Sequence, residues 1–289
     1  MKRKLVKQGV NALTVTLPSQ WTHKYGLKPG DEVNVHEQEK NLLISTEKNF
    51  EQESSVTIDS AKLNDVLLWT YIIAAYRKGA DEIKVKYESQ ERIKLIQKVV
   101  DALLGLAVVD QKSEFCIIKD LSGMTENTEF DQILRRIFIL LKNLSEETLT
   151  AIKTKNNSAL NNMEYQDYSI NKFSNFCLRL LSKKGHKDFH KTPIMHYIVS
   201  ELENLGDEYV RLALDAVNKK LSKEVISAIE DTNKFFIMYY HFFYKFDNTD
   251  SMKLLDQRDK LMNKIEKLLK TKKAEDIKIL YHLSKMVHI

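Results

Sequence analysis

The chain has 289 residues, of which 43% are apolar and 29% are charged, a balance that excludes a disordered polar chain. No window reaches the ~18 consecutive apolar residues of a membrane helix, and the basic start MKRKLVKQGV lacks the apolar core of a signal peptide. The cysteines Cys116 and Cys177 are far apart in the sequence, so we expect a cytoplasmic protein with reduced thiols.

Positive charge is concentrated at the beginning of the sequence, although the net charge is only +5. The first acidic residue is Asp31, and the Lys and Arg residues before it are Lys2, Arg3, Lys4, Lys7, Lys24 and Lys28. Unopposed positive charge attracts polyanions, which makes nucleic acid or an anionic membrane surface the expected class of partner.

Residues 1–48 are predicted to be rich in β-structure. Apolar and polar residues alternate in stretches that we interpret as strands, near residues 13–17, 33–36 and 42–45. Pro18 ends the first stretch and begins a short helix, and Gly26 suits the position after that helix. Lys28–Asp31 carries the Pro-Gly pair of a type II turn. So short a segment buries too little apolar surface to fold alone.

Residues 49–123 are predicted to form a small α/β domain, and the sequence leaves its role open. The patterns indicate the order β-α-β-α-β-β, with elements near residues 57–58, 63–77, 83–87, 90–104, 107–110 and 115–119. Gly79 and Gly105 follow the two helices as stop signals.

Residues 125–289 are predicted to be helical, because only Gly185, Gly206 and Pro193 interrupt them. Six helices are expected, over residues 128–155, 160–183, 193–219, 222–246, 250–271 and 273–288. One of them carries an apolar seam with the spacing of a helical bundle: Ile194, Ile198, Leu202, Leu205, Tyr209, Leu212 and Ala216.

Residues 1–48 resemble the AbrB/MazE/SpoVT swapped-hairpin DNA-binding domain. The matching stretches are KRKLVKQG, TVTLPSQW, YGLKPGDEV and NLLIS. In that family two chains interlace their hairpins into one barrel, so the resemblance implies a homodimer that binds DNA. It also implies DNA contacts for Lys2, Arg3, Lys4, Lys7 and Asn11. Charge alone adds Lys24 to these candidates.

Residues 125–289 resemble the PhoU family of phosphate-uptake regulators, which consists of two three-helix repeats. The local matches are SELENLGDEYVRLAL, from Ser200, and EYQDYSINKFSNFCLRLL, from Glu164. Archaeal proteins that fuse an AbrB-type head to a PhoU-like body resemble nearly the whole chain. The resemblance implies a divalent metal ion or a metal cluster at Asp167, Glu203 and Asp207. In the second repeat, Tyr281 and Lys285 replace the acids, which argues against a second metal site.

The acidic residues also stand out without the resemblance. Glu203 and Asp207 are four residues apart, so both carboxylates lie on one helix face, and Glu203 interrupts an apolar stripe. A carboxylate in such a place needs an arginine, a water or a cation as partner. Gly206 between them costs about 1 kcal/mol of helix propensity, which a close approach of another helix would explain. A salt bridge from Asp207 to Arg211 is the alternative to a metal site.

We interpret the protein as a non-enzymatic, DNA-binding regulator of transcription whose PhoU-like body senses or relays a state such as phosphate supply. The sequence contains no P-loop, dinucleotide-binding glycine pattern or nucleophile elbow. Three alternatives stay open: an antitoxin-like binding module, a scaffold that contacts a phosphate transporter or a signalling protein such as a sensor kinase while its head only dimerises, and a metal-dependent hydrolase.

Overall fold

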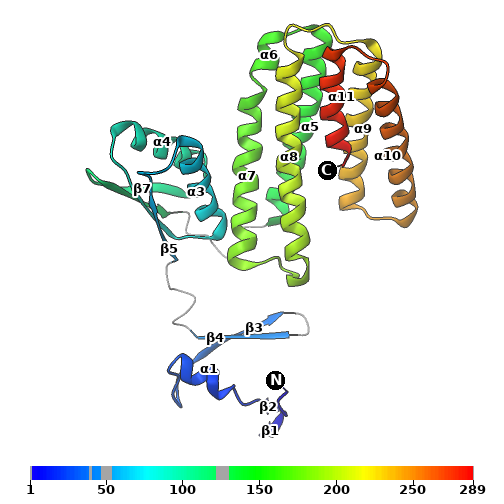
Figure 1. Ribbon diagram of the computed structural model, residues 1–289. Coiled ribbons are helices and arrows are strands. Elements are labelled where there is room, and N and C mark those ends of the chain that lie inside the picture. Colours follow the sequence, from blue (N-terminus) through cyan, green and yellow to red (C-terminus); the bar gives the residue numbers. More distant parts are fainter. Residues whose placement is uncertain (1, 39–40, 47–53, 122–129, 289) are drawn as a thin grey trace. The chain divides into compact units, whose positions relative to one another are not determined.

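The computed structural model describes residues 2–38, 41–46, 54–121 and 130–288. The chain folds into two compact units, residues 1–53 and 54–289. The first is rich in β-structure, and the second holds an α/β layer followed by the long helices (Figure 1). This order confirms the predicted fold class. The predicted boundary near residue 124 and the predicted helix start at residue 128 lie outside the described residues.

The first unit consists of two antiparallel hairpins and a short helix. Strands β1 (Val6–Gln8) and β2 (Ala12–Thr14) form one hairpin, and β3 (Val33–Gln38) and β4 (Asn41–Thr46) form the other. Helix α1 (Ser19–Lys24) lies between them in the chain. Strand β2 ends at Thr14, so the strand predicted to continue to residue 17 is shorter than expected.

The connection from α1 to β3 follows the predicted turn chemistry. The N–H of Leu27 donates to the carbonyl of Thr22, and that of Gly26 donates to His23, which together close the helix end. This closure requires the positive φ of 64° that Gly26 adopts. The N–H of Asp31 then donates to the carbonyl of Lys28, which confirms the predicted turn.

Apolar side chains of the first unit are exposed in a single copy. Leu13 is 63% exposed, Val35 is 55% exposed and Leu42 is 64% exposed. Among its residues with described side chains, only Thr46 is buried. A single copy of this unit therefore lacks an apolar core of its own, as its length predicts.

The α/β layer has the predicted element order. Strands β5 (Ser55–Asp59), β6 (Glu82–Lys86), β7 (Leu106–Gln111) and β8 (Phe115–Asp120) form a sheet of order β5-β6-β8-β7. Strands β5 and β6 are parallel, and the other pairs are antiparallel. Helices α3 (Asp65–Lys78) and α4 (Gln90–Asp101) bury their apolar residues against it.

Between residues 130 and 288, the helical part contains six long helices, as predicted. They are α5 (Phe130–Thr154), α7 (Met163–Lys184), α8 (Thr192–Ala216), α9 (Lys223–Tyr244), α10 (Asn248–Leu269) and α11 (Ala274–His288). The structure adds a short helix, α6 (Asn157–Asn161), and a 3₁₀ turn, η1 (Phe189–Lys191). The predicted start of the second helix at residue 160 is thus wrong by three residues.

The long helices contact one another in two sets of three (Figure 1). Helices α5, α7 and α8 form one set, and α9, α10 and α11 form the other; the sets meet through α8 with α11 and α5 with α9. The predicted seam of α8 is buried from Leu202 to Ala216, but Ile194 at its start is 50% exposed. No helix within the described part of the chain is long and apolar enough to cross a membrane.

Helix α7 joins the helical part to the α/β layer. Its Phe176 and Leu180 belong to the apolar core under the sheet. Arg179 of this helix is fully buried. Its guanidinium donates to the carbonyl of Tyr76 at 2.9 Å and to the carboxylate of Asp120 at 2.7 Å. An arginine with these partners tolerates burial because its charge is paired and both Nη groups donate, although its buried Nε has no hydrogen-bond partner among the described residues.

Candidate nucleic-acid interface and acidic helix pair

The predicted DNA-binding residues lie on the surface of the first unit. Lys2, Arg3 and Lys4 precede β1 in an extended segment, and Lys7 lies in β1 opposite Leu13 of β2. Asn11 lies in the turn that joins these strands. All five side chains are exposed.

In the described part of the chain, no carboxylate forms an ion pair with the basic side chains of Lys2, Arg3, Lys4 or Lys7. Lys24, the last residue of α1, is also exposed, and its ammonium lies 5.2 Å from the centre of the Tyr25 ring. Unpaired cations in an extended segment keep their charge available for phosphate groups.

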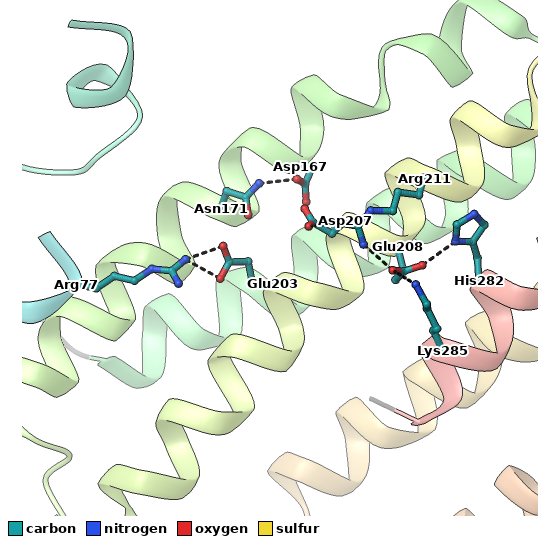
Figure 2. Close-up of polar contacts among 9 residues, drawn as sticks. All are labelled: Arg77, Asp167, Asn171, Glu203, Asp207, Glu208, Arg211, His282 and Lys285. Atoms are coloured by element: carbon teal, nitrogen blue, oxygen red, sulfur yellow. Dashed lines mark hydrogen bonds and ion pairs between the residues drawn. The ribbon is translucent and has the colours of Figure 1, made fainter. Parts of the chain in front are cut away.

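The acidic residues predicted on α7 and α8 come together where the two helices approach closely. Gly206 makes the approach possible: a Cβ atom there would lie 2.4 Å from Oδ1 of Asp167. This contact explains why a glycine occurs between two acids inside a helix, as the sequence predicted. Figure 2 shows the carboxylates of Asp167, on α7, and Asp207, on α8, directed toward each other where the two helices meet.

Glu203 is paired with an arginine from the α/β layer. Nη2 of Arg77, on α3, donates to both carboxylate oxygens, at 2.7 and 2.8 Å (Figure 2). Nε of Arg77 donates to Asn175. Burial raises the pKa of Glu203, while the guanidinium opposes that rise. The partner that the sequence predicted for Glu203 is therefore an arginine, which lies 126 residues away in the chain.

Asp207 forms the salt bridge that the sequence offered as the alternative to a metal. Nη2 of Arg211 donates to its carboxylate at 2.8 Å, one turn further along α8. In the described part of the chain, no three His, Cys, Asp or Glu side chains are placed to hold one metal ion. Arg77 and Arg211 would have to release Glu203 and Asp207 before a cation could bind, so the metal site stays a prediction.

Asp167 is the member of this group whose charge is least satisfied. Its Oδ2 accepts from Asn171 at 2.6 Å, but its buried Oδ1 has no hydrogen-bond partner. Burial and the neighbouring carboxylate of Asp207 raise the pKa of Asp167 to about 7. The side chain therefore holds a proton more readily than an ordinary aspartate.

Sequence reasoning missed a second polar cluster, between α8 and α11. Nδ1 of His282 lies 2.7 Å from Glu208, and its Nε2 lies 3.0 Å from Asp215. Burial raises the pKa of Glu208, but hydrogen bonds from His282, Arg211 and Lys285 together lower it below its ordinary value. The i,i+7 spacing of the two acids on α8 was a readable signal, but the histidine comes from a distant helix.

Tyr281 and Lys285, which replace the acids in the second repeat, lie in different surroundings. Tyr281 is 57% exposed, and Nζ of Lys285 donates to Glu208 at 3.2 Å. Lys285 thus supports the polar cluster between α8 and α11 rather than an acidic site of its own (Figure 2).

Residues 6–52 match the family model described as "Antidote-toxin recognition MazE, bacterial antitoxin". The match covers the hairpins and α1 and ends before the α/β layer begins. No curated protein and no solved structure matches the chain. The first unit is thus supported as a MazE/AbrB-type domain, a module that fits DNA binding or an antitoxin-like role. The PhoU resemblance of the helical part stays a prediction.

Proposed function

We propose that the protein is a DNA-binding regulator of transcription whose first unit binds DNA as a homodimer. The observation that carries the proposal is the MazE-type match over residues 6–52. Exposed basic side chains lie within the matched segment, at Lys7 and Lys24, and directly before it, at Lys2, Arg3 and Lys4. The exposed apolar residues of that segment support the dimer, because a second copy would cover them.

In this proposal the basic segment supplies affinity. Lys2, Arg3, Lys4 and Lys7 contact phosphates, and two copies double their number. Asn11, at the tip of the first hairpin, offers an amide that reads base edges. Phosphate contacts set the position of the protein on the duplex, so most of the affinity depends on salt and little of it on sequence.

Removal of two of these charges tests the interface. Arg3→Ala combined with Lys4→Ala is expected to weaken binding to every DNA tested, because a dimer loses four charges. The slope of log K against log salt should become shallower by roughly 3–4 units if each charge neutralises a phosphate. Fluorescence anisotropy with a labelled duplex at several salt concentrations measures it.

The matched control removes the same charge from another surface. Lys94→Ala combined with Lys98→Ala changes two exposed lysines of α4 and is expected to leave the salt slope unaltered. An unchanged slope in the Arg3/Lys4 variant would remove these residues from the interface.

The description of the matched family favours a second candidate, an antitoxin-like module. Such a module would suppress growth inhibition by a toxin partner. Co-expression with the products of adjacent genes separates the candidates: restored growth supports the antitoxin, whereas salt-dependent DNA binding without any growth rescue supports the regulator.

We further propose that the helical part relays a cellular state to the DNA-binding unit, with phosphate supply as the state that the PhoU resemblance implies. Chromatin immunoprecipitation with sequencing at high and low phosphate tests this link. Occupancy that changes with phosphate supports it, and constant occupancy at defined sites would leave DNA binding but remove phosphate. A scaffold for a phosphate transporter or sensor kinase would show no enriched sites.

A further inference from the structure

Within the described part of the chain, strand β5 forms an edge of the sheet that no other strand pairs with. The order β5-β6-β8-β7 leaves β5 with one neighbour among the described residues. The opposite edge strand, β7, carries a β-bulge between Val108 and Asp110, and Asp110 forms an ion pair with Lys112 at 3.4 Å. Bulges and charges are the devices that keep an edge from pairing. Strand β5 has a regular register and Asp59 as its one charged residue.

The backbone of β5 presents alternate residues to the outside. The N–H of Ser60 donates to Lys86, and the carbonyl of Ser54 accepts from Glu82, so the even-numbered residues face β6. Because a strand alternates its hydrogen-bonding direction, Ser55, Thr57 and Asp59 point their N–H and C=O groups away from the sheet. In the described part of the chain, none of these outward-pointing backbone groups has a hydrogen-bond partner.

A hollow of about 460 Å³ runs along this free edge. Strand β5 forms one wall, and the other contains Tyr71, Ala74 and Lys78 of α3. Two apolar side chains one turn apart on this face of α3 are exposed: Leu67 is 44% exposed and Tyr71 is 51% exposed. An added strand would therefore gain apolar contacts beside its backbone hydrogen bonds.

We propose that β5 pairs antiparallel with β5 of a second copy of this chain, centred on Thr57. In that register Thr57 lies opposite the partner's Thr57, and Ser55 lies opposite the partner's Asp59. These are the outward-pointing residues, so each opposed pair exchanges backbone hydrogen bonds. Ser55 and Asp59 also match in side-chain chemistry, as hydroxyl donor and carboxylate acceptor.

The same register extends the apolar core. Val56 lies opposite the partner's Ile58, on the face of the sheet that packs against the helices, where Ile58 is buried and Val56 is partly buried. Side chains in such non-hydrogen-bonded pairs lie closest together. The strand is therefore complementary to itself on both faces.

A second copy is the favoured occupant because of symmetry and connectivity. Antiparallel pairing about a single residue is an isologous, two-fold contact, the commonest symmetry of oligomers. This step rests on the proposed function: if the first units dimerise, residues 47–54 tether the two β5 strands at high effective concentration. A pair too weak to form from separate chains then forms within the dimer.

Cysteine cross-linking of the full chain tests the register. With Thr57→Cys, the two Cα atoms would lie about 5.5 Å apart, within the range of a disulfide. Ser55→Cys is the matched control on the same face of the strand, because the two cysteines would lie more than about 13 Å apart. The native Cys116 and Cys177 are buried. We expect a covalent dimer on non-reducing gels for Thr57→Cys alone; equal cross-linking of both variants, or none, would overturn the proposal.

Hydrogen exchange provides a second measurement that needs no substitution. The amides of Thr57 and Asp59 should be protected to a degree similar to that of Ser60, which is bonded to β6. Rapid exchange at Thr57 and Asp59 with slow exchange at Ser60 would show a free edge, open to a peptide of another protein, and would refute self-pairing. DNA binding by the same protein is scored separately, so failure of one proposal is distinguishable from failure of the other.

Discussion

At the scale of single residues, the contact between Gly206 and Asp167 determines how deeply the Asp167 carboxylate is buried between α7 and α8. The missing Cβ lets the carboxylate enter the space between α7 and α8, where Oδ1 finds no donor. A buried carboxyl group with a single hydrogen-bond donor and a neighbouring carboxylate favours its protonated form. The residue therefore links the stability of the helical part to pH.

The pKa of Asp167 predicts the direction of that link. Folding raises the pKa from 3.8 to about 7, so the folded state keeps a proton that the unfolded chain releases. Stability contributed by this proton is fully present below pH ~4, declines as pH rises and is lost above about pH 7, with a total of at most roughly 4 kcal/mol. Asp167→Asn should remove this dependence and raise the free energy of unfolding at pH 8, which urea titrations at pH 5 and pH 8 measure.

The metal hypothesis makes the opposite prediction for the same variant. If Asp167, Glu203 and Asp207 hold a cation, Asp167→Asn lowers stability at pH 8, and a chelator lowers the melting temperature of the wild type but not of the variant. A less stable variant together with bound metal in elemental analysis would contradict the protonation account.

At the scale of elements, α7 belongs to two cores at once. It packs against α5 and α8, and it also contributes Phe176 and Leu180 to the core under the sheet. Buried Arg179 fixes this junction, because it bonds both a carbonyl of α3 and Asp120 at the end of β8. A helix that is apolar on two faces and has a paired arginine between them holds the layer and the bundle together.

Loss of that arginine is expected to be costly. Arg179→Met removes the guanidinium that pairs with Asp120, whose side chain is 9% exposed, and with Asp81. Breaking a buried pair from one side costs about 3–5 kcal/mol. Lys183→Met is the control, since it breaks the more exposed pair with Asp81 and should cost at most about 1 kcal/mol. Denaturant unfolding compares them, and equal losses would show that Arg179 does not fix the junction.

At the scale of the whole molecule, the two units differ in how much apolar core a single copy contains. The second unit has two extensive apolar cores. The first exposes its apolar residues, including Val10 at 86% and Leu13 at 63%. We therefore expect its stability to depend on association and on protein concentration.

A peptide of residues 1–50 is expected to be dimeric whenever it is folded. Circular dichroism reports folding, and sedimentation at micromolar concentration reports mass. Dilution should unfold the peptide and dissociate it together, because the apolar surface is covered only in the dimer. A folded monomer at micromolar concentration would contradict the swapped-hairpin interpretation.

The sequence by itself determined the long helices, most of the strands and their order, but not the short helix α6 or the turn η1. Gly26 and Gly30 sit where local backbone geometry requires a positive φ, and the periodicity of apolar residues places the long helices within a few residues of their observed ends. These features depend on interactions between near neighbours in the chain, which short patterns record. The acids Glu203 and Asp207 were recognisable as one helix face for the same reason.

Only the tertiary structure decided what those acids contact. Arg77 reaches Glu203 from 126 residues away, and His282 reaches Glu208 from 74 residues away. Nothing in the sequence around Arg179 indicates that it is buried, because its burial results from the packing of α7 on the sheet. Such pairs are set by the packing of whole layers, which imposes no spacing on the sequence. The free edge of β5 is likewise a consequence of strand order, and an edge strand and a central strand of the same composition look alike in one chain.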